Sequence, residues 1–241
     1  MGLEFGEGIP VVTEQLSLPK LRPRWVRAGL LTILIGGVVG YGSVTRRQWF
    51  EGNFGVVEAN RVYRSAQPTK NLRPLIAANQ IASVLNLRGG SMRDPWYVDE
   101  VATTQELGVA FYDLSMSATK RPSRSQILTL LDLFRRCKYP LLIHCRQGAD
   151  RTGMAAGLYL LSERSLPPER AMAEFTISHG HVPLFGPEHL HEPFDEYAGY
   201  LTTEHLTHSP EQFRDWVEHH YVADDGLMAI TPLDSGPRVR R

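Results

Sequence analysis

A short apolar run followed by a glycine-containing loop constrains the fold of this chain more than any other feature. Leu141, Leu142 and Ile143 have the composition of a buried strand. The loop after them reaches Thr152, and the alanine- and leucine-rich run over residues 155–161 is typical of a helix. Where a strand leads through a tight turn into a helix N-terminus, consecutive backbone N–H groups can face one point. The sequence therefore predicts an anion-binding loop.

Three side chains in this loop make it a candidate for covalent chemistry. Cys145 lies at its base, where the dipoles that attract phosphate also favour a thiolate. Arg151 carries a guanidinium group that can bind two phosphate oxygens at once. We expect the hydroxyl of Thr152 to donate a hydrogen bond to the sulfur. A nucleophile beneath a bound phosphate predicts transfer of the phosphoryl group to sulfur, followed by hydrolysis.

The segment His144–Gly153 reads HCRQGADRTG and resembles the H-C-x5-R-[ST] signature of the cysteine-dependent protein tyrosine and dual-specificity phosphatases. RVYRSAQP at residues 61–68 and VLNLR at residues 84–88 precede it, in the order seen in the bacterial dual-specificity-like group. A glycine within the signature and a Thr-Gly pair after it make a chance match to C-x5-R improbable.

The resemblance implies roles for individual residues. Cys145 would be the nucleophile, Arg151 would bind the phosphate, and His144 would orient the loop. The other expected substrate-binding residues are Arg146, Gln147, Gly148, Ala149, Thr152 and Arg88, which follows a predicted strand end. The implied chemistry needs no metal or other cofactor.

The proton donor to the leaving oxygen is a separate question. The family commonly has an Asp before the signature, in a pattern like LPIPD, whereas the matching LSMSA places Ala118 there. Asp150 is our first choice, because CRQGADRT resembles the CxxGxDRT loop of the myotubularin lipid phosphatases; alternatively it pairs with Arg151 and fixes the loop. Asp113, at the end of a predicted strand, is the second choice, with capping of a turn as its alternative.

Strand and helix patterns alternate along residues 53–222. Strands are expected near residue 62 and over residues 81–87, 109–114 and 141–145; helices are expected over residues 72–79, 99–107, 123–137, 168–178, 194–200 and 210–221. This alternation predicts an α/β fold, with a central, largely parallel sheet flanked by helices on both faces. The phosphatase family has that architecture. A flexible tail is expected over residues 223–241.

An uncharged run of 17 residues, from Ala28 to Val44, precedes this domain and has arginines on both sides. It predicts one N-terminal transmembrane helix, a signal anchor over residues 25–47, after a flexible segment 1–24. A cleaved secretory signal and a buried core helix are the alternatives. Arginines are more numerous on the N-terminal side, so the positive-inside tendency predicts that the phosphatase domain lies on the non-cytoplasmic side.

The predicted function is hydrolysis of phosphomonoesters, with phosphotyrosine, phosphoserine and phosphothreonine proteins as substrates. A phospholipid or phosphoinositide phosphatase is the alternative, and a non-catalytic phosphate-binding scaffold is a second one. The balance of 26 basic and 26 acidic residues argues against nucleic acid as a partner, leaving the substrate and a membrane bound through residues 25–47.

His179, His181, His189 and His191 are interpreted as surface or structural residues. Cys137, the second cysteine, is expected at a helix end, with a redox lock on Cys145 as the minor alternative.

Overall fold

Five short strands form the sheet of the α/β domain in the computed structural model, which describes residues 23–49 and 52–223. The strands are β1 (Gly55–Glu58), β2 (Val62–Ser65), β3 (Ser83–Asn86), β4 (Ala110–Asp113) and β5 (Leu141–His144). Their order across the sheet is β1-β2-β5-β3-β4. Only β1 is antiparallel to its neighbour; the other pairs are parallel. The prediction of a largely parallel sheet is confirmed, with one added antiparallel edge strand.

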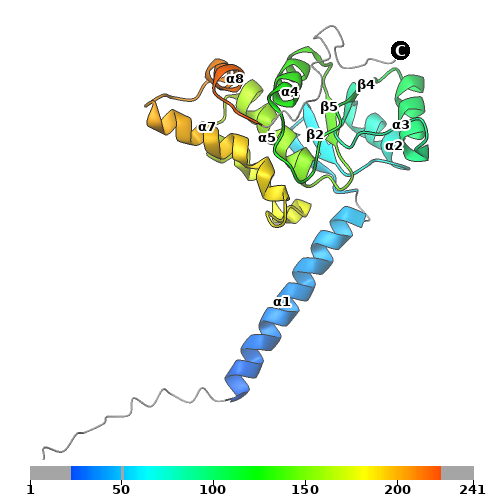
Figure 1. Ribbon diagram of the computed structural model, residues 1–241. Helices are drawn as coiled ribbons and strands as arrows, with labels where there is room; N and C mark the ends of the chain where they lie inside the picture. Colours follow the sequence, from blue (N-terminus) through cyan, green and yellow to red (C-terminus); the bar gives the residue numbers. More distant parts are fainter. Residues whose placement is uncertain (1–22, 50–51, 224–241) are drawn as a thin grey trace, which may run out of the picture. The chain divides into compact units, whose positions relative to one another are not determined.

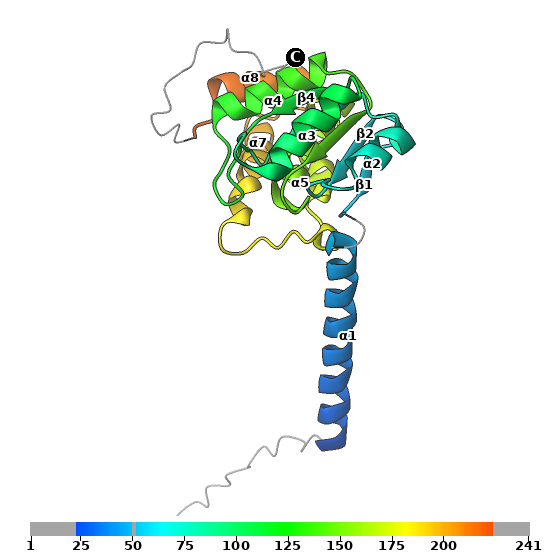
Figure 2. The same cartoon turned by 90° about the vertical axis from the view of Figure 1, so that its right-hand side faces the viewer.

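Helices cover both faces of this sheet. They are α2 (Leu72–Asn79), α3 (Pro95–Glu106), α4 (Arg124–Arg136), α5 (Asp150–Arg164), α6 (Pro168–Ala171), α7 (Glu192–Thr203) and α8 (Pro210–His219), with short 3-10 turns η1 (Met172–Glu174), η2 (Ile177–His179) and η3 (Pro187–Leu190). Figure 1 shows α2 and α3 on one side of the sheet and α4 and α5 on the other, and the same layers can be followed in Figure 2.

The alternation of side chains along β5 explains the two layers. Leu141 and Ile143 belong to the larger apolar cluster, which contains the buried faces of α4, α5, α7 and α8. Leu142 belongs to the smaller cluster, with residues of α2 and α3. All three side chains are fully buried, as expected for a parallel strand with helices on both faces.

The register of the parallel strands brings their carboxyl ends to one level. His144 is paired with Ser65 of β2 on one side and with Asn86 of β3 on the other, and Asn86 is paired with Asp113 of β4. Loops that follow these residues therefore meet at one edge of the sheet, where ligands bind in open α/β sheets.

The helix predicted over residues 168–178 is wrong beyond Ala171, where the chain changes to the 3-10 turns η1 and η2. The guanidinium group of Arg64 donates to the backbone carbonyl of Glu174 at 2.7 Å, so this carbonyl binds a side chain where a continuing α-helix would bind a backbone N–H. Thr176 is then extended, and its Oγ1 accepts a hydrogen bond from the backbone N–H of His179 at 3.2 Å, which starts η2.

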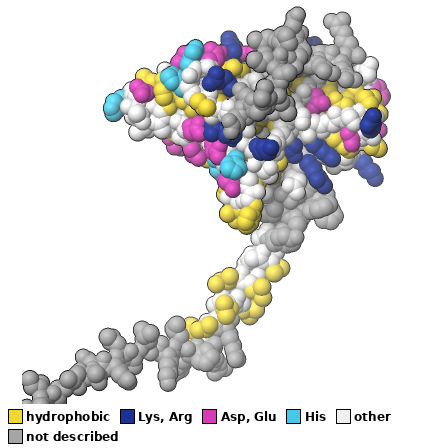
Figure 3. Space-filling view, viewed as in Figure 1, with side chains coloured by type: hydrophobic (Ala, Val, Ile, Leu, Met, Phe, Trp, Pro, Cys, Tyr) yellow, Lys and Arg dark blue, Asp and Glu magenta, His cyan; other side chains and the backbone are white. Residues whose placement is uncertain are grey.

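The N-terminal segment predicted as a membrane anchor is helical. This helix, α1 (Pro23–Trp49), exposes apolar side chains such as Leu30, Ile33 and Leu34 along its described part (Figure 3). Within the residues that the structure describes, no helix combines the length and the apolar character that crossing a membrane requires. The prediction for residues 25–47 is thus confirmed as a helix but not as a transmembrane segment. The non-cytoplasmic placement of the α/β domain stays a prediction, and the predicted flexible ends fall almost entirely outside the described residues.

Candidate active site

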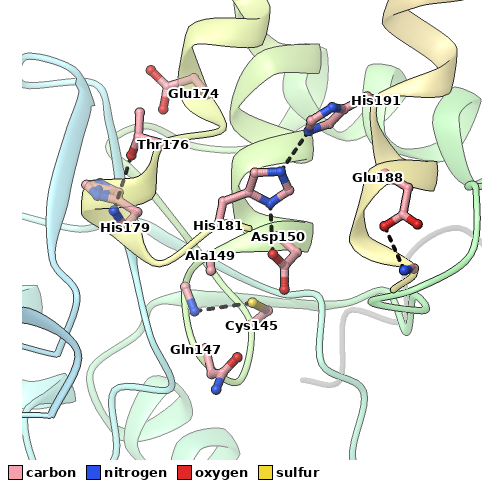
Figure 4. Close-up of polar contacts among 12 residues, drawn as sticks. Cys145, Gln147, Ala149, Asp150, Glu174, Thr176, His179, His181, Glu188 and His191 are labelled. Atoms are coloured by element: carbon pink, nitrogen blue, oxygen red, sulfur yellow. Dashed lines mark hydrogen bonds and ion pairs between the residues drawn. The ribbon is translucent and has the colours of Figure 1, made fainter. Parts of the chain in front are cut away.

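The loop that carries Cys145 joins the end of β5 to the first residue of α5. Gly148 has φ of +70°, a conformation that L side chains rarely adopt. A Cβ atom at this position would lie 2.5 Å from the backbone nitrogen of Ala66 and the carbonyl carbon of Ser65. The resulting turn directs the backbone N–H of Gly148 toward the Sγ of Cys145 at 3.3 Å, the dashed line beside Cys145 in Figure 4. The thiol therefore lies within a turn of backbone amides at a helix N-terminus.

Arg151 is held beside this loop by one edge of its guanidinium group. Its NH1 donates to the backbone carbonyls of Leu87 at 3.3 Å and Met116 at 3.2 Å. Its Nε is buried and has no hydrogen-bond partner among the described residues. Because an unsatisfied buried N–H is unfavourable, this nitrogen is suited to binding an anion.

Arg64 supports the loop from the protein interior. It is 1% exposed, and its NH2 donates to the carbonyls of Gly148 at 3.0 Å and Ala149 at 3.2 Å. In a trans peptide the carbonyl and the next N–H point in opposite directions, so fixing these carbonyls inward also fixes the following amides. Its NH1 binds the Glu174 carboxylate at 2.8 Å. Arg64 thus binds the backbone of the loop.

Asn53 and Glu100 are two further supports that the sequence did not indicate. The buried Asn53 donates through Nδ2 to the carbonyls of Gln147 at 2.7 Å and His179 at 2.8 Å. The carboxylate of Glu100 in α3 is buried, with its Oε1 2.8 Å from Nε2 of His144, a distance typical of an ion pair although the angle is poor for a hydrogen bond. His144, the residue before the nucleophile, is therefore held by a side chain of α3.

Arg88 lies on the same side of the molecule as the loop arginines. Its guanidinium group stacks over the Trp96 ring at 3.9 Å from the ring centroid. Burial, together with the positive charges of Arg146 and Arg151, lowers the pKa of Arg88 below its ordinary value. Asp94 and Glu100 act on the same guanidinium group in the opposite direction, so the surroundings of Arg88 combine basic and acidic side chains.

The two candidate proton donors have different surroundings. Asp113 accepts hydrogen bonds from the Tyr97 hydroxyl at 2.8 Å and from Nδ2 of Asn86 at 3.3 Å, which ties two strand ends to α3. These contacts hold the carboxyl against side chains of α3 and β3, and both roles expected for Asp113 stay predictions. Asp150 is the first residue of α5, and its Oδ1 lies 2.9 Å from Nδ1 of His181. Its partner is thus a histidine, whereas Arg151 binds backbone carbonyls.

The side chain of Thr152 differs from the expectation. The Thr152 hydroxyl is buried and makes no hydrogen bond within the described part of the chain, so the predicted bond to the sulfur is not formed. Arg146 and Gln147 are exposed, while Ala149 is buried. In the same described ranges, no group of three or more His, Cys, Asp and Glu residues is arranged to hold a metal ion.

Attack by a thiol on a phosphate held by amides and one arginine is the chemistry of the cysteine-dependent tyrosine and dual-specificity phosphatases, and the fold and the loop described above are of that class. A family model described as DSP-PTPase phosphatase fused to NAD+ kinase matches residues 38–176, more than half of the chain. The protein belongs to this family. No curated protein sequence matches the chain.

Three solved structures illustrate the structural neighbourhood. TpbA of P. aeruginosa in complex with pTyr has a TM-score of 0.48 and 17% identity, covering 70% of this chain and 92% of that one. The core catalytic domain of the PP-IP phosphatase SIW14 from S. cerevisiae, in complex with citrate, has a TM-score of 0.49 and 20% sequence identity. The match covers 64% of this chain and 93% of that one. PTPMT1 in complex with PI(5)P has a TM-score of 0.45 and 16% sequence identity, and the match covers 64% of this chain and 99% of that one.

Proposed function

We propose that this protein hydrolyses phosphomonoesters through a cysteinyl-phosphate intermediate, with phosphotyrosine, phosphoserine and phosphothreonine proteins as its substrates. The observation that carries the proposal is the 3.3 Å contact between the Gly148 N–H and the Cys145 sulfur, because it directs an amide of the loop toward the nucleophile. The family to which the chain belongs is one of dual-specificity and tyrosine phosphatases, which supports protein substrates.

In the first step the loop amides and Arg151 bind the phosphate oxygens. The thiolate of Cys145 attacks phosphorus in line, so that an S–P bond forms while the bond from phosphorus to the leaving oxygen breaks. The leaving oxygen takes a proton from the carboxylic acid of Asp150. His144, held by Glu100, keeps the end of β5 in place during this change.

In the second step a water molecule attacks phosphorus, and the S–P bond breaks to return the thiolate. The ionised Asp150 takes the proton of that water, which restores the acid for the next turnover. Phosphate then leaves. The balance of protons requires no other group, but it requires the same carboxyl to act first as an acid and then as a base.

The direct test is phosphate release by the full-length protein under reducing conditions, with an aryl phosphate and a phosphopeptide as substrates. We expect Cys145→Ser to lower kcat at least about 10³-fold, as removal of a nucleophile does in other enzymes. Cys137→Ser is the matched control, because Cys137 caps α4 away from the loop. Folded wild type that binds phosphate without turnover would instead support the scaffold alternative.

A phosphoinositide or other multiply phosphorylated substrate is the second candidate, favoured by the arginines at the loop. Burial lowers the pKa of Arg88, and the charges of Arg146 and Arg151 lower it further, so both lie near its guanidinium group. A head group with several phosphates could bind more than one of these guanidinium groups at once, whereas one phosphomonoester bound by Arg151 would leave Arg88 and Arg146 to their protein neighbours.

The two substrate classes can be separated with Arg88→Gln. If the natural substrate carries several phosphates, this variant should lose about tenfold in kcat/KM on a phosphoinositide and little on an aryl phosphate. Arg73→Gln is the control, because Arg73 forms an exposed ion pair with Glu106. An equal and small effect on every substrate would leave protein substrates as the better proposal.

A further inference from the structure

Asp150 is the first member of a chain of three side chains that come from separate segments. Nδ1 of His181, just after η2, lies 2.9 Å from Oδ1 of Asp150. Nε2 of the same ring lies 2.7 Å from Nε2 of His191, at the start of α7. Figure 4 shows the three side chains in line, with the Asp150 carboxylate on the side of His181 that faces Cys145.

The middle ring of this chain is enclosed, while its two ends are less so. The side chain of His181 is 3% exposed and that of Asp150 is 17% exposed. The Phe175 ring packs against both imidazoles, with its centroid 4.9 Å from that of His181 and 4.3 Å from that of His191. His191 is partly exposed. The arrangement therefore runs from the nucleophile loop toward solvent, with its orientation fixed by an aromatic ring.

The distances restrict where protons can lie. Two ring nitrogens 2.7 Å apart need one proton between them, because two lone pairs or two N–H groups would repel each other. When Nε2 of His181 accepts a hydrogen bond from the N–H of His191, the single proton of a neutral His181 ring lies on Nδ1. This N–H then donates to Oδ1 of Asp150, which can accept it whether Oδ2 carries a proton or not. The hydrogen bond from His191 thus determines the tautomer of His181. The hydrogen bond from His181 in turn fixes the position of Oδ1 of Asp150.

We propose that His181, held by His191, is a positioning residue that presents Asp150 to the leaving oxygen of the substrate. The proposal rests on the function proposed above. Oδ1 of Asp150 stays bound to the histidine, which leaves Oδ2 to donate its proton as the S–P bond forms and the P–O bond breaks. The carboxylate that remains is stabilised by the His181 N–H until Oδ2 takes a proton from the attacking water.

The dependence of the rate on the leaving group tests this role. An alkyl phosphate needs a proton on its leaving oxygen, whereas a nitrophenyl phosphate leaves readily without one. In the full-length protein we expect Asp150→Asn and His181→Phe each to lower kcat about 100-fold or more on the alkyl substrate and less than about tenfold on the aryl substrate. KM should change little, because neither side chain binds the phosphate.

The double variant separates a positioning role from a structural one. If His181 acts through Asp150, then Asp150→Asn combined with His181→Phe should be no slower than Asp150→Asn alone. His181→Asn should recover part of the alkyl activity, since its amide can donate from near the position of Nδ1. His191→Phe should show the same leaving-group pattern more weakly. These variants keep the test available if His181→Phe does not fold.

His189→Gln is the matched control, because His189 is an exposed neighbour whose Nδ1 binds Glu192 at 2.6 Å, apart from this chain of residues. It should retain wild-type rates on both substrates. Folded His181 variants that lose the same factor on alkyl and aryl phosphates, or a double variant with additive losses, would overturn the inference. Absence of turnover in wild type, or activity that survives Cys145→Ser, would instead overturn the proposed function itself.

Discussion

At Gly148 the loop passes against the end of β2 so closely that no side chain fits. An alanine there would combine an unfavourable φ of +70° with a contact of 2.5 Å to backbone atoms of Ser65 and Ala66, and backbone cannot move aside as a flexible side chain can. We expect Gly148→Ala to destabilise the protein by about 1–3 kcal/mol and to lower kcat at least about tenfold. Chemical denaturation and phosphate release measure the two effects.

Gly199 gives the contrasting substitution. It lies inside α7, and a Cβ atom there would have nothing within 4 Å. Gly199→Ala should therefore raise the stability by about 0.5–1 kcal/mol and leave kcat unchanged. Full activity in Gly148→Ala would show that the nucleophile does not need this loop conformation.

The residues that could be predicted at this scale are those close together in the sequence. Cys145, Gly148 and Arg151 fall within one short segment, so their spacing alone indicates a phosphate loop. The supports of that loop come from elsewhere: Arg64 is 84 residues from Gly148, and Asn53 is 126 residues from His179. No local pattern joins such pairs, because only the tertiary fold brings them into contact.

Among the secondary-structure elements, those with a regular apolar period were predictable. In α4 the buried residues Ile127, Leu130, Leu131 and Phe134 recur at helical spacing, and the Ser123 hydroxyl caps the first turn. The segment after α6 is also predicted as a helix, but it does not continue as one, because the buried Arg64 binds the Glu174 carbonyl. A tertiary hydrogen bond there outweighs helix propensity, which is worth only tenths of a kcal/mol per residue.

His208 links two helices in a way that should make stability depend on pH. Its Nε2 donates to the Leu161 carbonyl of α5 at 3.2 Å, and its Nδ1 lies 3.0 Å from the Tyr197 hydroxyl of α7. Burial lowers the pKa of His208. Below the ordinary value of about 6.5, the unfolded chain binds a proton that the folded chain does not.

The free energy of unfolding should therefore fall as the pH decreases from about 6.5, with His208 contributing at most about 1.4 kcal/mol per pH unit. Above that pH, His208 should contribute nothing to the pH dependence of stability. Urea denaturation at several pH values measures this. In His208→Gln the slope below pH 6.5 should be smaller, even if the variant is less stable at neutral pH. An unchanged slope would assign the acid sensitivity to other groups, such as His191, whose pKa burial also lowers.

On the scale of the whole domain, the sheet separates its two cysteines. Cys145 follows the carboxyl end of β5, whereas Cys137 caps α4 before the amino end of the same strand, near Arg61 and Tyr139. A four-residue strand spans roughly 13 Å, well beyond the Cα separation of about 7 Å that a disulfide tolerates. Both thiols are free, and burial raises the pKa of Cys137 to about 11, which keeps it protonated and unreactive.

The redox lock between these two residues should therefore not form in the folded protein. Hydrogen peroxide should inactivate wild type and Cys137→Ser at the same rate, and added thiol should restore both to the same extent, because only Cys145 carries the chemistry. Peptide mass spectrometry of the oxidised protein supplies an independent readout. A Cys137–Cys145 linked peptide from protein that still unfolds cooperatively would mean that β5 opens in the native state, since only displacement of that strand could bring the two sulfurs together.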